Sequence, residues 1–159
     1  MAAAILRRFT LFLLLVAAGV GPLSAAETFR TGQLTIESAS GGKYRFDIEL
    51  AETPAQMAQG LMFREQMAPD AGMLFILPAV QPMSMWMKNT LIPLDMVFMA
   101  TDGRITHIHQ RAVPHSLDTI SSGGPVKAVL EINGGMAARL GIRVGDRVIH
   151  DAFKAQGSN

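Results

Sequence analysis

A tryptophan-containing run that ends in polar residues is the part of this sequence best suited to chemistry. Met83–Thr90 contains Trp86, the only tryptophan of the chain. Four polar residues follow the indole, within this run and shortly after it: Lys88, Asn89, Thr90 and Asp95. An indole beside an ammonium, an amide, a hydroxyl and a carboxylate can recognise a carboxylate, a phosphate or a sugar. We therefore expect a polar groove beside Trp86 that binds a polar or anionic small molecule or an envelope component.

The same polar residues also suit a tight turn. Asn, Thr and Asp side chains commonly bond to the backbone of turns, and in that arrangement Lys88 and Asp95 would form a salt bridge. The sequence leaves both alternatives, the binding site and the locked turn, open.

Two further charged residues, Glu131 and Arg64, are expected near this run. Glu131 lies within the apolar segment Val126–Ile132, and a buried carboxylate needs a partner or takes a raised pKa. Paired with Arg64, it would serve the architecture. Alternatively, Glu131 or Asp95 acts as a general base while Lys88 or Arg64 stabilises an anion, as in a small envelope hydrolase or transferase. Whether the protein is an enzyme stays open, because no nucleophile or metal motif supports this alternative.

Methionines and histidines supply the remaining candidate ligands. Three methionines alternate around the tryptophan: Met83, Met85 and Met87. Thioethers bind Cu(I), so a methionine-rich copper-binding protein is a second alternative. Core packing is favoured, because the run should be buried and methionine fills irregular cores. His107 and His109 share one face of a predicted strand without an adjoining carboxylate, so the sequence predicts no metal site and no cofactor.

Short strands should position these residues. Gln33–Glu37 and Lys43–Leu50 alternate apolar and polar residues around a glycine-containing turn, which predicts a hairpin. Thr53 and Gln56 form a capping box for a helix that begins at Pro54. Further strands are predicted over Met73–Leu77, Met83–Lys88, Leu94–Ala100, Ile105–Gln110, Val126–Ile132 and Arg147–Ile149, and a second short helix over Met136–Leu140.

Hairpin turns between short strands favour mainly antiparallel pairing. A domain of this size then closes into a barrel or sandwich with helices at its ends. The predicted fold class is α+β, mostly β: a small barrel-like, mainly antiparallel sheet with two short helices. Its core covers residues 33–150. Arg111–Pro125 is predicted to be a loop long enough to form a lid or a binding loop.

The N-terminal segment, residues 1–26, has the pattern of a secretory signal peptide. Two arginines precede the apolar run Phe9–Val20, and Ser24 and Ala26 supply the small residues that a signal peptidase requires. The apolar run is shorter than the ~20 residues that span a bilayer as a helix. We expect an exported protein, periplasmic or extracellular, with one globular domain over residues 27–159. It would touch the membrane only through this segment, if the segment stays uncleaved.

Composition excludes several kinds of partner and chemistry. The chain has no cysteine, which rules out disulfides, thiolate metal sites and a cysteine nucleophile. It has 14 Lys and Arg residues against 13 Asp and Glu residues, without a basic cluster, so nucleic-acid binding is not expected. The predicted partner is an unknown small molecule or envelope component.

Motifs spaced through the whole domain resemble those of the domain-of-unknown-function 192 family. In chain order they are Thr53, Gly60-Leu61-Met62-x-Arg64, Gly72-Met73-Leu74-Phe75, Trp86-Met87-Lys88-Asn89-Thr90-x-x-Pro93-Leu94-Asp95, Leu130-Glu131-Ile132-x-Gly134-Gly135 and Gly145-Asp146. The likeness covers about Gln33–Ile149. It implies the fold of a family that is widespread in bacteria and archaea and often exported or membrane-tethered, but it brings no established activity. The motifs point to seven candidate ligand-binding residues: Arg64, Trp86, Lys88, Asn89, Thr90, Asp95 and Glu131.

Overall fold

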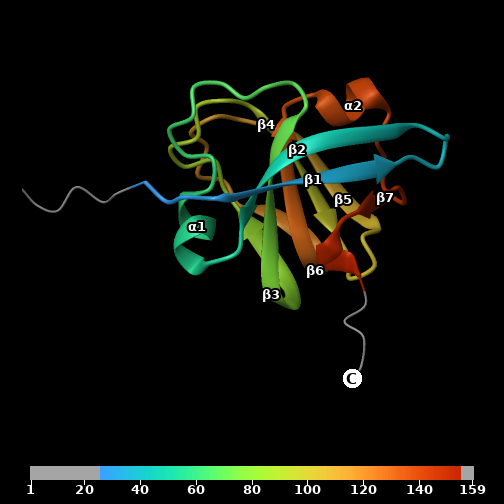
Figure 1. Ribbon diagram of the computed structural model, residues 1–159. Helices are drawn as coiled ribbons and strands as arrows, with labels where there is room; N and C mark the ends of the chain where they lie inside the picture. The colour runs from blue at the N-terminus through green and yellow to red at the C-terminus, as the bar shows by residue number, and fades with distance from the viewer. Residues whose placement is uncertain (1–25, 155–159) are drawn as a thin grey trace, which may run out of the picture.

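Seven strands form one mixed, mainly antiparallel sheet that curls into a half-barrel, with the order β5-β4-β6-β3-β2-β1-β7 (Figure 1). The computed structural model describes residues 26–154, so the predicted signal peptide, except Ala26, lies outside the described residues. The elements are β1 (Arg30–Glu37), β2 (Lys43–Ala51), α1 (Pro54–Gln59), β3 (Ala71–Met85), β4 (Leu94–Met99), β5 (Ile105–Ala112), β6 (Ile120–Asn133), α2 (Met136–Leu140), β7 (Arg147–Ile149) and a 3-10 turn (Asp151–Phe153). No helix within this part of the chain has the length and apolar character needed to cross a bilayer.

The predicted hairpin is present as β1 and β2. Its two strands pair antiparallel from Arg30 opposite Leu50 to Glu37 opposite Lys43. The alternation of β2 buries Phe46 and Ile48 on one face, as expected for a strand with one solvated face. β2 and β3 form the parallel pair of the sheet, because α1 and the following turn carry the chain back before β3 begins.

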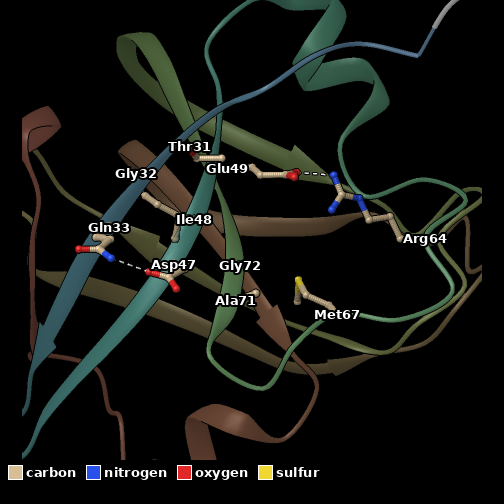
Figure 2. Close-up of a pocket in the computed structure, with 10 residues that line it drawn as sticks. All are labelled: Thr31, Gly32, Gln33, Asp47, Ile48, Glu49, Arg64, Met67, Ala71 and Gly72. Carbon is tan, nitrogen blue, oxygen red and sulfur yellow. Dashed lines mark hydrogen bonds and ion pairs between the residues drawn. The ribbon is translucent and has the colours of Figure 1, made fainter.

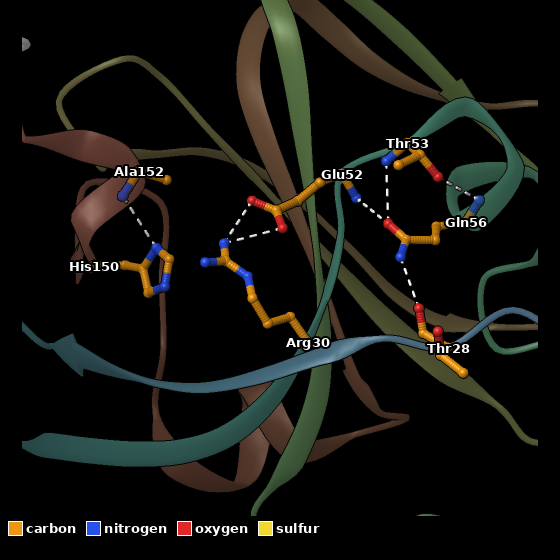
Figure 3. Close-up of polar contacts among 7 residues, drawn as sticks. All are labelled: Thr28, Arg30, Glu52, Thr53, Gln56, His150 and Ala152. Atoms are coloured by element: carbon orange, nitrogen blue, oxygen red, sulfur yellow. Dashed lines mark hydrogen bonds and ion pairs between the residues drawn. The ribbon is translucent and has the colours of Figure 1, made fainter.

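A capping box starts α1, as the sequence predicts. The Thr53 hydroxyl accepts a hydrogen bond from the Gln56 backbone N–H (3.2 Å), and the Gln56 side-chain oxygen accepts one from the Thr53 backbone N–H (3.1 Å). The Gln56 amide also donates to the Thr28 carbonyl (2.7 Å), and the Arg30 Nη2 atom donates to both carboxylate oxygens of Glu52 (2.8 and 3.0 Å; Figure 3). These contacts fix α1 against the N-terminal segment of the domain.

Replacing Thr53 with alanine should lower the free energy of unfolding by about 1 kcal/mol, since an N-cap hydroxyl is lost at the helix start. Urea denaturation at pH 7 measures this change. Thr53→Ser keeps the hydroxyl and serves as the matched control. An alanine variant as stable as the serine variant would show that the cap contributes nothing.

Both faces of the sheet are covered by apolar clusters. The α2 cluster comprises Leu34, Ile36, Phe46, Ile48, Leu50, Leu74, Val97, Met99, Ile105, Ala128, Leu130, Ile132, Met136, Ala137, Ile142 and Val148. The α1 cluster comprises Ala51, Leu61, Met73, Phe75, Met87, Leu94, Met96, Phe98, Ala112, Ile120, Val126 and Val129. Alternate residues of β4 belong to different clusters, which explains why all six residues of this strand are buried.

The two edges of the sheet meet near β7. β7 pairs antiparallel with β1, and an isolated bridge joins Arg104 to Arg147. The Ile105 backbone N–H donates to the Asp146 carbonyl (2.9 Å), and the Gly145 N–H donates to the Ile105 carbonyl (2.9 Å). The β4–β5 turn therefore covers part of the edge that β7 would otherwise expose.

Two predicted elements differ from the observed ones. Met83–Lys88 is not a separate strand, because β3 continues through Pro78 and Pro82 up to Met85. The pairing with β6 shifts register between residues 76 and 81 and again between 82 and 84. Proline lacks a backbone N–H, and an irregular ladder tolerates this loss.

The predicted long loop Arg111–Pro125 is also wrong over most of its length. β5 extends to Ala112 and β6 begins at Ile120. The short remaining connection is tied to the segment after β3, since Met87 N–H donates to the Ser116 carbonyl (3.0 Å). A lid made of this whole segment is therefore not possible.

Candidate functional site

Glu131 occupies an unusual position in the middle of the sheet. On β6 it lies opposite Met73 of β3 and opposite Met96 of β4. Both methionines are fully buried, and Glu131 itself is only 4% exposed. Val129, two residues earlier, belongs to the α1 cluster, so the Glu131 side chain emerges on the same apolar face.

A small cavity opens beside this carboxyl group. Its volume is about 90 Å³. Its lining, the set that defines the Glu131 cavity, comprises Met57, Ala58, Gln59, Gly60, Leu61, Met62, Phe75, Met83, Ser84, Met85, Trp86, Lys88, Thr90 and Glu131. α1 with its following turn forms one wall, and the end of β3 with the residues after it forms the other. A void of ~10–15 Å³ already holds one water, so the cavity admits a small guest.

The Glu131 carboxyl group has no protein partner within residues 26–154. The hydrogen bonds and ion pairs of this region involve other groups, and burial alone raises the pKa of Glu131 to about 8. Within residues 26–154, every side-chain nitrogen or oxygen that is completely sealed from solvent has a hydrogen-bond partner, so the unpartnered oxygens of Glu131 are not completely sealed. The carboxyl oxygens therefore reach the cavity, and at pH 7 the group is mostly the neutral acid.

Trp86 and Lys88 form the rim of the cavity. Both follow the end of β3, and Trp86 is 52% exposed. The Lys88 Nζ atom lies 5.4 Å from the centroid of the indole ring, which is a cation–π distance. The rim thus presents a flat apolar surface and a positive charge above a neutral acid.

Asn89 and Thr90 hold the turn that follows. Asn89 has a φ of 56°, a conformation that asparagine tolerates better than most residues. Its carbonyl accepts from the Phe63 N–H (2.8 Å), and its side-chain amide approaches the Met62 sulfur (3.9 Å). Thr90 is buried and lines the Glu131 cavity. Of this pair, only Thr90 faces the candidate site.

Asp95 lies outside the site and serves the architecture. It is fully buried, and its carboxylate accepts three backbone hydrogen bonds of 2.8 Å, from Arg111, Gly135 and Ala137. It therefore satisfies the N-terminal N–H groups of α2, whose own N-cap residue provides no side-chain hydrogen bond. Within residues 26–154, Asp95 forms no salt bridge with Lys88, in contrast to the turn arrangement considered from the sequence. Its three backbone hydrogen bonds also leave the carboxylate unavailable as a general base.

Arg64 is likewise separated from Glu131. It forms an ion pair with Glu49 of β2 (Figure 2). Both line a different, open hollow of about 660 Å³, whose walls include Asp47 and Met67. The predicted pairing of Arg64 with Glu131 is therefore wrong.

The structure thus gathers four of the seven predicted residues, namely Trp86, Lys88, Thr90 and Glu131. The sequence reasoning missed Met57 and Met62, which reach the cavity from α1 and the turn after it. Met62 belongs to the Gly60-Leu61-Met62-x-Arg64 motif and Met57 precedes it, but methionines at these places are also typical of a packed helix end.

The histidines form no cluster with carboxylates. His107 stacks on Phe98, with ring centroids 5.6 Å apart. Among residues 26–154, no group of three or more His, Cys, Asp or Glu side chains could hold a metal ion.

The chain is similar to one protein family and to solved structures. The sequence model of the DUF192 family, described as Uncharacterized ACR, COG1430, matches residues 35–150. A crystal structure of a putative transcription regulator from Sinorhizobium meliloti 1021 is 47% identical, with a TM-score of 0.78, and the match covers 80% of this chain and 99% of that one. A crystal structure of a protein of unknown function from Novosphingobium aromaticivorans DSM 12444 is 41% identical, with a TM-score of 0.74, over 80% of this chain and 94% of that one. A search of curated proteins finds no match.

Proposed function

Because the chain belongs to the DUF192 family, which is described only as uncharacterised, we propose that it is an exported binding protein that takes a small guest into the Glu131 cavity. Trp86 and Lys88 flank the guest at the rim, and Glu131 contacts it at the wall. Export follows from the predicted signal peptide over residues 1–26.

The buried, unpartnered carboxyl group of Glu131 carries this proposal. Removing a polar group from water without a hydrogen bond costs roughly 2–7 kcal/mol. Its two sheet neighbours, Met73 and Met96, indicate that an apolar side chain would fit the same face. A residue that destabilises the fold at a cavity wall is typical of a binding site.

An enzymatic function has weaker support from the geometry. A carboxyl group with a pKa of about 8 is mostly protonated at pH 7, so Glu131 is a poor general base there. Asp95 is engaged by backbone N–H groups, and Arg64 is paired with Glu49. The hydrolase or transferase alternative therefore retains Lys88 as its anion stabiliser and lacks a free base.

The description of the Sinorhizobium relative as a transcription regulator is not carried over to this chain. Binding to DNA depends on neutralising phosphates with Lys and Arg. The chain has 14 basic against 13 acidic residues, which is not the charge of a typical DNA-binding domain.

Protein purified from the cells that make it should carry its guest, and native mass spectrometry should detect the added mass. The variant Glu131→Leu should lose this mass, since the leucine removes the polar contact and fills the cavity wall. Glu65→Leu, a replacement of an exposed glutamate outside the cavity, is the matched control. The proposal fails if wild type and Glu131→Leu carry the same mass, or if neither carries any.

A further inference from the structure

We propose that the guest of the Glu131 cavity is Cu(I), bound by thioether sulfurs drawn from Met57, Met62, Met83 and Met85 together with the Glu131 carboxylate. This inference rests on the proposed function and names the ligand of the same site.

The first argument is the convergence of methionines on one small cavity. Met57 comes from α1, Met62 from the turn that follows, and Met83 and Met85 from the end of β3. Three separate segments of the chain thus bring thioethers to a space of about 90 Å³. A space of this size accommodates a single ion together with the side chains that bind it.

The second argument is the exposure of these side chains. Met73, Met87 and Met96 are fully buried and pack in the α1 cluster, so core packing accounts for them. The four cavity methionines are instead half-buried; Met57, Met83 and Met85 lie at the border of the same cluster, so one side of each packs on the core and the other faces the cavity. The sequence favours core packing, because a metal ligand must be partly exposed and this run is expected to be buried. The methionines at the cavity wall are partly exposed, so this objection does not apply to them.

The third argument is the match between the donor set and the metal. Thioethers are soft, uncharged ligands that select Cu(I), whereas Ca²⁺, Mg²⁺ and Zn²⁺ prefer oxygen, imidazole or thiolate ligands. Glu131 is the only acidic residue in the cavity lining, so its carboxylate balances one positive charge. Lys88, the other charged residue of the lining, is exposed and lies over the Trp86 ring, so a monovalent ion compensates the one buried charge, that of Glu131, and a divalent ion leaves an excess charge in an apolar surrounding.

Binding should release one proton. The acid form of Glu131 loses its proton to solvent as the carboxylate oxygen binds Cu(I), with no change in the oxidation state of copper. Lys88 is the other charged group in the lining, and its ammonium lies over the Trp86 ring. Because the proton and the ion compete for one carboxylate, the affinity should rise with pH.

Competition with a colorimetric chelator tests the inference on the mature chain. Cu(I) is supplied as its bicinchoninate complex without oxygen, and its transfer to the protein is followed by loss of the colour. Trp86, the only tryptophan, gives a second signal through its fluorescence. We expect one Cu(I) per chain, at least 30-fold weaker binding in the double variant Met83→Leu/Met85→Leu, and at least tenfold weaker binding with a flattened pH dependence in Glu131→Gln.

The control is Met67→Leu, which replaces a half-buried methionine outside the Glu131 cavity and should bind Cu(I) within twofold of wild type. Circular dichroism establishes that each variant is folded. Absence of transfer to wild type, or equal binding by the double variant, overturns the copper assignment. If wild type then still carries a guest that Glu131→Leu loses, the proposed binding function stands and only its ligand is wrong; if no guest is found either, both fail.

Discussion

Replacing Glu131 with leucine should stabilise the protein at pH 8 and remove most of the decline in its stability between about pH 4.5 and pH 8. Burial raises the pKa of Glu131 from 4.5 to about 8. The folded state therefore binds more protons than the unfolded state in this window, and the free energy of unfolding falls as pH rises. The stabilising effect of the protonated acid is complete below pH 4.5 and lost above pH 8. The loss is on the order of 5 kcal/mol for a shift of this size.

Urea denaturation at pH 5, 6.5 and 8 measures this effect as the difference between wild type and Glu131→Leu. The difference is needed because burial lowers the pKa of His150. His150 makes stability rise with pH in both proteins, so its contribution cancels. Glu65→Leu, at an exposed site, should keep the wild-type pH dependence. Parallel curves for wild type and Glu131→Leu would mean that the acid is not buried in solution.

Replacing Asp95 with alanine should destabilise the protein, by a free energy of unfolding comparable in size to the stabilisation expected from Glu131→Leu. Three backbone N–H groups, those of Arg111, Gly135 and Ala137, would lose their acceptor. An unsatisfied buried donor costs about 1–3 kcal/mol, so we expect a loss of about 4 kcal/mol or more in the free energy of unfolding. Such a loss is a large share of the ~5–15 kcal/mol that stabilises a domain.

The graded control for this prediction is Asp95→Asn. Its amide keeps one oxygen as an acceptor and turns the other position into a donor, so it should destabilise the protein, but less than alanine does. Thermal unfolding followed by circular dichroism ranks the two variants, and proteolysis should cut first near α2. A loss below about 1 kcal/mol for alanine would exclude the anchoring role of Asp95.

Much of the fold could be predicted from local patterns. The β1–β2 hairpin follows from strict alternation, the start of α1 from the Thr53 capping box, and α2 from its flanking glycines. The DUF192 likeness over the domain is confirmed. Pro78 and Pro82 were misleading, because a bulged pairing with β6 lets β3 continue past them. That pairing joins distant parts of the chain and has no local signal.

The site could be predicted only in part. Residue type indicated that Lys88 and Glu131 belong to a polar cluster, and both line the cavity. Asp95 and Arg64 carry equally suitable groups, but their partners are backbone N–H groups in one case and Glu49 in the other. Which partner a charged group finds depends on packing across the sheet. Met57 was missed because a methionine on a short helix also matches ordinary core packing.

The position of β7 determines when this protein can fold. The last strand of the sheet pairs with the first, and the turn before β5 is completed by hydrogen bonds to the segment preceding β7. β1 therefore obtains its second neighbour only after β7 has been made. Non-local pairing of this kind folds slowly and late. The edge of β1 that pairs with β7 thus stays unpaired in the growing chain until residues 147–149 have been made.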